Sequence, residues 1–207
     1  MIKDLTLQTF LDQLASGSST PGGGSAAGLM GAMGAALVGM VCQFTVGREK
    51  YAAVDADMRR VLDAAEVARR VLTDAIAADV AAFDQVMAAY GLTRTSEEEK
   101  TARTAAIQHA LKLATEVPLA CARACADIIR LSAEAAELGN TNVVSDAGVA
   151  VMAAYAGLKS AALNVYVNTS SIRDEAFSAA RVQELDTLLA AAEGDVARIF
   201  DAVRARL

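Results

Sequence analysis

The sequence predicts an all-α fold, an up-and-down bundle of long helices that takes in residues 1–207 as one domain. Three observations support this prediction. Hydrophobic residues make up 54% of the chain, aromatic residues make up only 4%, and alanine, a strong helix former, is abundant. Only two prolines interrupt the sequence. Few windows show the strict alternation of apolar and polar residues that is typical of half-buried strands.

The expected helices follow one another through short polar connections. We expect them over residues 3–15, 26–46, 54–90, 96–138, 145–170 and 174–207. Ser96, with Glu99 three residues later, is a capping box that marks the start of the fourth helix. Pro118 should kink that helix, because its ring removes a backbone N–H and clashes with the preceding turn. Helices of this length with faces of small residues also favour a homodimer that pairs through helix faces.

The most unusual segment is a run of uncharged residues from Ser16 to Gly47 that includes three consecutive glycines, 22–24. Glycines allow positive φ angles and a close approach of the backbone to a ligand. A helix that starts directly after them would offer unpaired N–H groups and the positive end of its dipole to a polar ligand. A flexible linker is an equally weighted alternative. The run matches neither a Walker loop nor a Rossmann fingerprint.

The apolar stretch 26–46 is long enough to span a membrane, and Gly24, Gly28, Ala32 and Ala36 form a row of small residues of the kind found in membrane helices. Glycine and alanine are only weakly hydrophobic, however, and the other predicted helices have charged faces. The first 16 residues do not have the pattern of a signal peptide. We therefore expect a buried central helix in a cytoplasmic protein with no membrane partner.

Composition excludes several classes of function. The net charge of −6 and the lack of a basic stripe argue against nucleic acid as a partner. Cys42, Cys121 and Cys125 lie in helical sequence, and no further ligands with suitable spacing accompany them, so we interpret them as core thiols of a reduced, cytosolic protein rather than a zinc site. His109 is the only histidine. No metal site is predicted.

Two groups of polar residues stand in otherwise apolar helical sequence. Asp79 has alanine and valine neighbours, so it is a candidate general acid or base, with a surface position on an alanine-rich face as the equal alternative. Asp84, five residues later, should be solvated. Asn164 and Asn168 share one helix face and are expected either to line a pocket or to bond to neighbouring helices. Ser145 or Asp146 is expected to cap the helix that carries them.

The chain resembles one known family over almost its whole length. The resemblance rests on segments that occur in the same order and at similar spacing: Thr20–Ser25, Gly47–Tyr51, Asp79–Phe83, Gly139–Asn142, Ser145–Asp146 and Asn164–Asn168. These segments are similar to those of the formimidoyltetrahydrofolate cyclodeaminase and methenyltetrahydrofolate cyclohydrolase family. The likeness is greatest to the stand-alone cyclohydrolases of methylotrophic bacteria. The animal enzymes carry an added formiminotransferase domain, and we expect no such activity here.

The resemblance implies a helical homodimer that binds folate near the glycine run. It implies hydrolysis of 5,10-methenyltetrahydrofolate to 10-formyltetrahydrofolate by acid–base chemistry, with no metal and no prosthetic group. The implied catalytic residues are Asp79, Lys50 and Asp146. The implied substrate-binding residues are Pro21, Gly22, Gly23, Gly24, Ser25, Arg48, Asn140, Asn142, Asn164 and Asn168. Cyclodeamination of 5-formiminotetrahydrofolate and folate binding without catalysis remain as alternatives.

Overall fold

The chain folds as an all-helical bundle, which confirms the predicted fold class. The computed structural model describes residues 2–207, and these residues contain helices and connections but no strand. The α-helices of this part are α1 (Leu7–Leu14), α2 (Gly23–Gln43), α3 (Asp55–Tyr90), α4 (Glu97–Leu138), α5 (Val144–Thr169) and α6 (Glu175–Arg204). Short 3-10 helices are η1 (Ile2–Asp4), η2 (Glu49–Val54) and η3 (Thr141–Val143).

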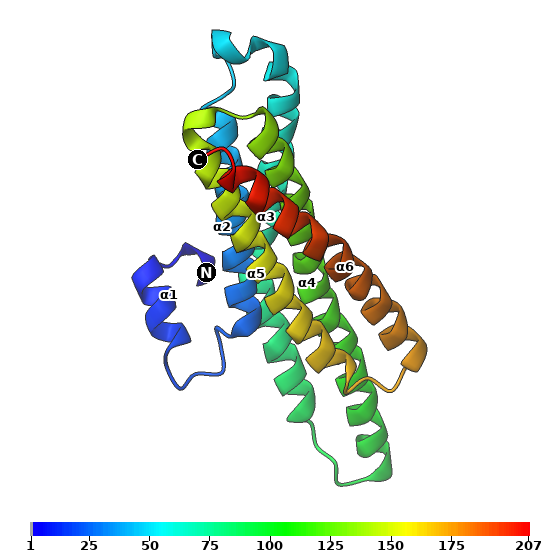
Figure 1. Ribbon diagram of the computed structural model, residues 1–207. Coiled ribbons are helices and arrows are strands. Elements are labelled where there is room, and N and C mark those ends of the chain that lie inside the picture. The colour runs from blue at the N-terminus through cyan, green and yellow to red at the C-terminus, as the bar shows by residue number, and fades with distance from the viewer. Residues whose placement is uncertain (1) are drawn as a thin grey trace.

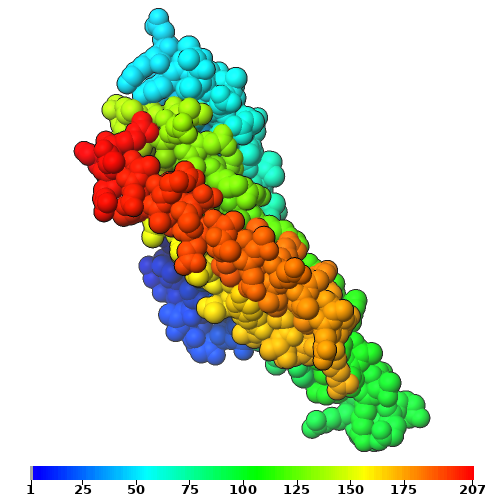
Figure 2. Space-filling model, turned by 45° about the vertical axis from the view of Figure 1, so that its right-hand side comes forward, coloured from blue at the N-terminus to red at the C-terminus, as the bar shows by residue number. Residues whose placement is uncertain are grey.

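Helices α2 to α6 alternate in direction along the bundle (Figure 1). Both α2 and α4 pack against α3 and α5, so these four helices surround a common core, and α6 lies across α4 and α5. Helix α1 lies at one side of the bundle (Figure 2), and η1, which precedes it, contacts α3, where Lys3 forms an ion pair with Asp74. The up-and-down order is therefore confirmed for α2 to α6, whereas pairing with a second copy stays a prediction.

The core is built from aliphatic side chains and from unusually close contacts between helices. Met58, Leu72 and Leu158 are fully buried within it. Helices α2 and α5 come so close that a Cβ added to Gly157 would lie 3.0 Å from the Gly31 nitrogen and 3.1 Å from the Ala27 carbonyl oxygen. The small residues of the uncharged run therefore serve to bring two helices together.

Two helical segments are long and apolar enough to cross a membrane by length and composition alone, namely residues 23–43 and 141–169. Inside the bundle, 61% of the apolar window of the first and 50% of that of the second are buried. Core helices of soluble proteins have the same composition. The prediction of α2 as the central buried helix agrees with this burial.

The start of α2 differs from the sequence prediction. The helix begins at Gly23, with Gly22 as its N-cap, rather than at Ala26. None of these glycines has a positive φ, and among the described glycines only Gly47, at φ 72°, does. The glycine run therefore does not use the positive φ angles that its residues allow. Gly24 instead admits the Asp79 side chain, because an added Cβ would lie 2.0 Å from the Asp79 Oδ1 atom.

Of the two predicted helix caps, one is confirmed and one is wrong. The Ser96–Glu99 capping box is present, and Asp174 caps α6 by accepting from the Phe177 N–H at 3.0 Å. Ser145 and Asp146 do not cap α5, because α5 begins at Val144 and both residues lie within its first turn. The turn ahead of α5 is closed by Asn140, whose side chain accepts from the Asn142 N–H at 3.0 Å. Pro118 is buried inside α4, which continues without a break.

Candidate active site

A cavity of about 380 Å³ lies where α2 begins, among α3, α4 and α5. Helices α3 and α4 continue past the first residue of α2 (Figure 1), and the cavity lies beside this residue. Asp79, Asn164 and Asn168 are in its wall. The remaining lining residues are Ser19, Thr20, Gly22, Gly23, Gly24, Ala82, Phe83, Val86, Leu111, Ala114, Val167 and Ser171. The cavity thus has an apolar lining with a few polar groups, which is typical of small-molecule sites.

Residues at the start of α2 fix the position of the Asp79 carboxylate. The buried Ser25 hydroxyl lies 2.8 Å from Asp79 Oδ2 and 3.2 Å from the Ile76 carbonyl oxygen, and it can donate to either. Gly24 packs directly against the carboxylate, since a side chain there would overlap it. Asp79 itself is half-buried and has no cationic partner among residues 2–207. A carboxylate held in this way can accept a proton from a bound molecule.

The two asparagines are each anchored by one hydrogen bond to a backbone carbonyl. The Asn164 amide donates to the Ser160 oxygen at 2.9 Å, and the Asn168 amide donates to the Ala114 oxygen at 2.8 Å. Both side chains also border the cavity. Both asparagines therefore line a pocket, whereas only Asn168 bonds to a neighbouring helix, because Ser160 belongs to the same helix as Asn164.

A second polar group lies at the other end of α2. Asn140 donates its side-chain amide to the Phe44 oxygen at 3.0 Å, and its backbone N–H to Thr45 Oγ1 at 2.9 Å. The Tyr51 hydroxyl donates to Asn140 Oδ1 at 3.2 Å. Hydrogen bonding with Thr141 lowers the pKa of Tyr51 below its usual range.

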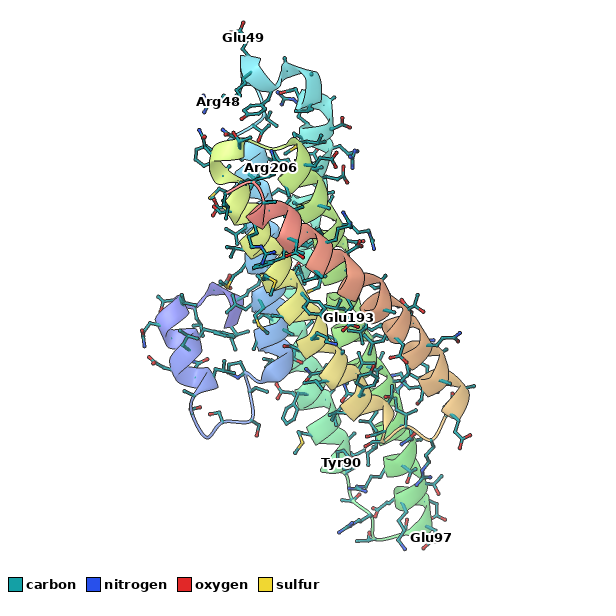
Figure 3. All side chains as sticks on the ribbon, in the orientation of Figure 1. Arg48, Glu49, Tyr90, Glu97, Glu193 and Arg206 are labelled. Carbon is teal, nitrogen blue, oxygen red and sulfur yellow. The ribbon has the colours of Figure 1, made fainter. Side chains whose placement is uncertain are left out.

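The charged residues of this second group have few partners. Arg48 and Lys50 are exposed, and within the described chain neither lies at ion-pair distance from a carboxylate; the Lys50 ammonium sits 5.1 Å from the Tyr51 ring centre. Asp146 is half-buried and makes no hydrogen bond or ion pair with residues 2–207, and Asn142 is exposed. Figure 3 shows Arg48 at the end of the bundle opposite to Tyr90 and Glu97.

One copy of the chain therefore does not bring all the predicted site residues together. Gly22, Gly23, Gly24, Asp79, Asn164 and Asn168 share the cavity, and Ser25 supports it from behind. Pro21 is buried next to the cavity but is not part of its wall. Arg48, Lys50, Asn140, Asn142 and Asp146 form the second group. The two groups are separated by the length of α2, whose 21 residues span about 30 Å.

Sequence reasoning did not assign roles to several residues at these places. Phe83 and Leu111 line the cavity and Tyr51 organises the second polar group. Phe83 follows Asp79 by four residues, so helical spacing places both on one face. This spacing could have predicted that Phe83 lies beside Asp79 in the site. Leu111 comes from a distant helix, and no local pattern indicates its position. Asp84 is exposed, as predicted.

A larger hollow of about 500 Å³ lies between α3 and α4, but its charges are paired. Arg123 bonds to Glu184, Arg130 to Asp127, and Arg60 to Glu134. Each of these charges is neutralised by its partner, so no charged group in this hollow is left without a partner to bind a ligand. The smaller cavity contains an unpaired carboxylate, so we take it as the candidate site.

The cysteines are buried and free, in agreement with the prediction of core thiols. Burial raises the pKa of the Cys42 thiol to about 12. A hydrogen bond with Cys121, and burial as a second cause, raise the pKa of Cys125. Across residues 2–207, no group of three or more His, Cys, Asp or Glu side chains is placed to hold a metal ion.

Known proteins with similar sequences point to one family. The family model described as formiminotransferase-cyclodeaminase matches residues 6–187. The methenyltetrahydrofolate cyclohydrolase of Methylorubrum extorquens is 57% identical over 202 residues, which are 98% of this chain and 97% of that protein. The formimidoyltransferase-cyclodeaminase of Sus scrofa is 38% identical over 200 residues, which are 97% of this chain but only 37% of that protein.

The fold leads to the same family. The crystal structure of the formiminotetrahydrofolate cyclodeaminase of Thermotoga maritima superposes with a TM-score of 0.88 and 34% sequence identity. The match covers 99% of this chain and 98% of that chain. The family match, the near-full-length identity and the shared fold show that the chain belongs to the formiminotransferase-cyclodeaminase family.

Proposed function

We propose that this protein hydrolyses 5,10-methenyltetrahydrofolate to 10-formyltetrahydrofolate, reversibly, in one-carbon metabolism. The observation that carries the proposal is the 57% identity to the Methylorubrum cyclohydrolase over nearly the full length of both chains. The cavity supports it, because its volume of about 380 Å³ and its mixed lining suit the flat, polar-edged ring system of a folate.

The reaction needs a base, an acid and groups that hold the ring. The carbon between N5 and N10 of the substrate is a cation, so it accepts water directly. As the water oxygen bonds to this carbon, Asp79 takes one proton from the water. The tetrahedral adduct then collapses: the second O–H proton leaves, the carbon–oxygen double bond forms, the carbon–N5 bond breaks, and N5 receives a proton. The balance is one water consumed and one proton released.

The proposal gives the predicted site residues the following roles. Asp79 is general base and acid, oriented by Ser25 and Gly24. The amides of Asn164 and Asn168 orient the ring or the water, and the backbone of residues 22–24, with Pro21 behind it, covers one side of the folate. Asp146, Asn140 and Asn142 lie about 30 Å from the cavity in the same chain. The role that the family resemblance implies for them, holding polar edges of the ring, therefore requires the second copy of the proposed homodimer, and the same is true of Lys50 and Arg48. Lys50 and Arg48 bind the anionic glutamate tail or assist proton transfer.

We further propose that the protein works as one helical domain over residues 1–207, as a cytoplasmic homodimer without a prosthetic group. The Methylorubrum relative matches over the same span, which supports the single domain. The partial burial of both apolar segments in the bundle supports a location away from membranes. The acid–base scheme assigns no step to a metal.

Cyclodeamination is the second candidate, because the Sus scrofa and Thermotoga maritima relatives bear that name. In that reaction N10 attacks the formimino carbon on N5 and ammonia leaves. Purified protein should be given each substrate separately, with product chromatography and an ammonia assay. The proposal expects rapid conversion of 5,10-methenyltetrahydrofolate and little ammonia from 5-formiminotetrahydrofolate. The opposite preference would replace the first candidate with the second.

Gly24→Ala tests whether the start of α2 positions the catalytic carboxylate. The added Cβ would lie 2.0 Å from Asp79 Oδ1, so the carboxylate must move. A displacement of this size is expected to lower kcat by about 100-fold. Gly17→Ala is the control, since nothing lies within 4 Å of its added Cβ and Gly17 is exposed. Equal kcat values for the two variants, with both proteins folded by circular dichroism, would show that Asp79 need not be held by Gly24.

A further inference from the structure

We propose that Arg173, in the turn between α5 and α6, binds the carboxylates of the glutamate tail of the folate. The substrate then lies in the cavity with its pterin ring towards the start of α2, and its tail leaves the cavity beside Ser171. This inference rests on the proposed function and deepens it by fixing the direction of the substrate and naming a residue that recognises the tail. It leaves Lys50 and Arg48 with assistance in proton transfer as their role.

The cavity is polar at one end and apolar at the other. Asp79 and Asn164 line it next to the start of α2, where the backbone of residues 22–24 is also part of the wall. Helices α3 and α5 run in the same direction away from this point (Figure 1). Val86 lies seven residues after Asp79 and therefore about 10 Å further along α3, and the side chains of Val86 and Leu111 make this second end apolar.

A folate has three parts whose chemistry matches this order. The pterin ring has polar edges, the p-aminobenzoyl ring is apolar, and the glutamate tail carries two carboxylates. The reacting carbon lies between the two ring systems, so a folate with this carbon at Asp79 can place its polar ring against the start of α2 and its apolar ring against Phe83 and Leu111. The tail, which is joined to the far side of the apolar ring, then emerges beside Ser171, the exposed lining residue that follows α5.

Charge opposes the reverse direction. Asp79 is the only charged residue in the described lining of the cavity, and it is negative. A folate placed the other way round would bring its two tail carboxylates to the same end as Asp79, where like charges raise the energy of the complex. The proposed direction separates the tail from Asp79 by the length of the apolar part of the cavity.

The turn that carries Arg173 is held against the cavity by α4. Gln108 Nε2 donates to the Ser171 oxygen at 3.0 Å, and the Arg173 N–H donates to Gln108 Oε1 at 2.6 Å. Between them, Ile172 is only 8% exposed and belongs to the same apolar cluster as Leu111, which also lines the cavity. Ser171 and Arg173 are both exposed. The turn therefore keeps Arg173 at a fixed place next to the cavity, on the solvent side.

The charge of Arg173 is available to a ligand, because within residues 2–207 no carboxylate lies at ion-pair distance from it. The neighbouring Asp174 bonds to Lys112 Nζ at 2.6 Å and accepts the Phe177 N–H at 3.0 Å, so its charge is already engaged. Residues 171 and 173 are at most about 7 Å apart, a gap that a glutamate tail and an arginine side chain can bridge together. The guanidinium group matches a carboxylate with two parallel hydrogen bonds.

The tail site can be tested by binding, without turnover. The probes are 5-formyltetrahydrofolate, a stable folate, and 5-formyltetrahydropteroate, which is the same compound without the glutamate. Equilibrium dialysis should give a dissociation constant for the folate that is about fivefold higher in Arg173→Gln than in the wild-type protein, and higher again in Arg173→Glu. The dissociation constant for the pteroate should be the same in all three proteins, because this compound has no tail to recognise.

Arg204→Gln is the matched control. Arg204 is also exposed, and it lies at the far end of α6, whose 30 residues span about 45 Å. Its replacement should change neither dissociation constant. Unchanged folate binding in Arg173→Gln, or an equal loss for both probes, would overturn the tail site. A wild-type protein that binds the two probes equally well does not recognise the tail, and this result too would overturn the proposal.

The binding experiment and the turnover assay can fail independently. If Arg173 discriminates between the two probes but the wild-type protein converts neither folate substrate, the proposed function fails and the tail site stands. If the protein hydrolyses 5,10-methenyltetrahydrofolate and Arg173→Gln changes the binding of neither probe, the proposed function stands and the tail site fails.

Discussion

Asp79→Asn is expected to lower kcat for 5,10-methenyltetrahydrofolate by about 100- to 10,000-fold, because the amide cannot take the proton of the attacking water. The change keeps the shape of the side chain, so the contact with Gly24 and the hydrogen bond from Ser25 can persist. Folate affinity, measured by equilibrium dialysis, should therefore change little. A loss confined to kcat is the sign of a group that acts on the reacting atoms.

Asp84→Asn is the matched control for this variant. Asp84 lies five residues later in the same helix, is exposed and is outside the cavity. It should retain wild-type kcat. An Asp79→Asn protein with near-wild-type kcat would contradict the catalytic role of Asp79. If the variant instead loses folate affinity while its kcat is unchanged, Asp79 is a substrate-binding residue and not a catalytic one.

Gly157→Val is expected to lower the free energy of unfolding by about 3 kcal/mol or more, the upper part of the range for overpacked cores. Its Cβ would lie 2.9 Å from Cys125 Sγ, 3.0 Å from the Gly31 nitrogen and 3.1 Å from the Ala27 oxygen. Two of these atoms are backbone, so relief requires α2 and α5 to separate. Urea unfolding at one fixed protein concentration measures the change, because the stability of any oligomer depends on concentration.

Gly194→Ala is the control for that substitution. Gly194 also lies inside a helix, α6, but nothing is within 4 Å of an added Cβ. Alanine should stabilise the helix there by up to about 1 kcal/mol. If Gly157→Val unfolds at the same urea concentration as wild type, the close approach of α2 and α5 is not important for stability.

Much of the fold follows from sequence because the helices are long and have clear boundary signals. The Ser96 capping box lies where the sequence predicts it, and α6 begins at Glu175, one residue after the predicted start. The start of α2 was missed, because glycine has a low helix propensity and only the packing of Asp79 against Gly24 explains a helix that begins there. The start of α5 was missed because a preceding turn, closed by Asn140, replaces a side-chain cap on α5.

Individual residues of the candidate site could be predicted from the sequence, but their arrangement in space could not. Asp79, Asn164 and Asn168 stood out as polar residues in apolar helices, and they do share a cavity. Lys50 and Asp146 belong to the same family segments, yet they lie at the far end of α2. Sequence order gives no distance between helices, so the separation of these residues could not be predicted.

The most direct test of the proposed reaction is the near-ultraviolet absorbance of 5,10-methenyltetrahydrofolate, in a buffer that hydrolyses it slowly, after the purified protein is added. The absorbance should fall at an initial rate proportional to protein concentration and saturable in substrate, with 10-formyltetrahydrofolate as the product. A decay that stays at the rate of the protein-free buffer, at every protein concentration, would contradict the assignment of this chain as a methenyltetrahydrofolate cyclohydrolase.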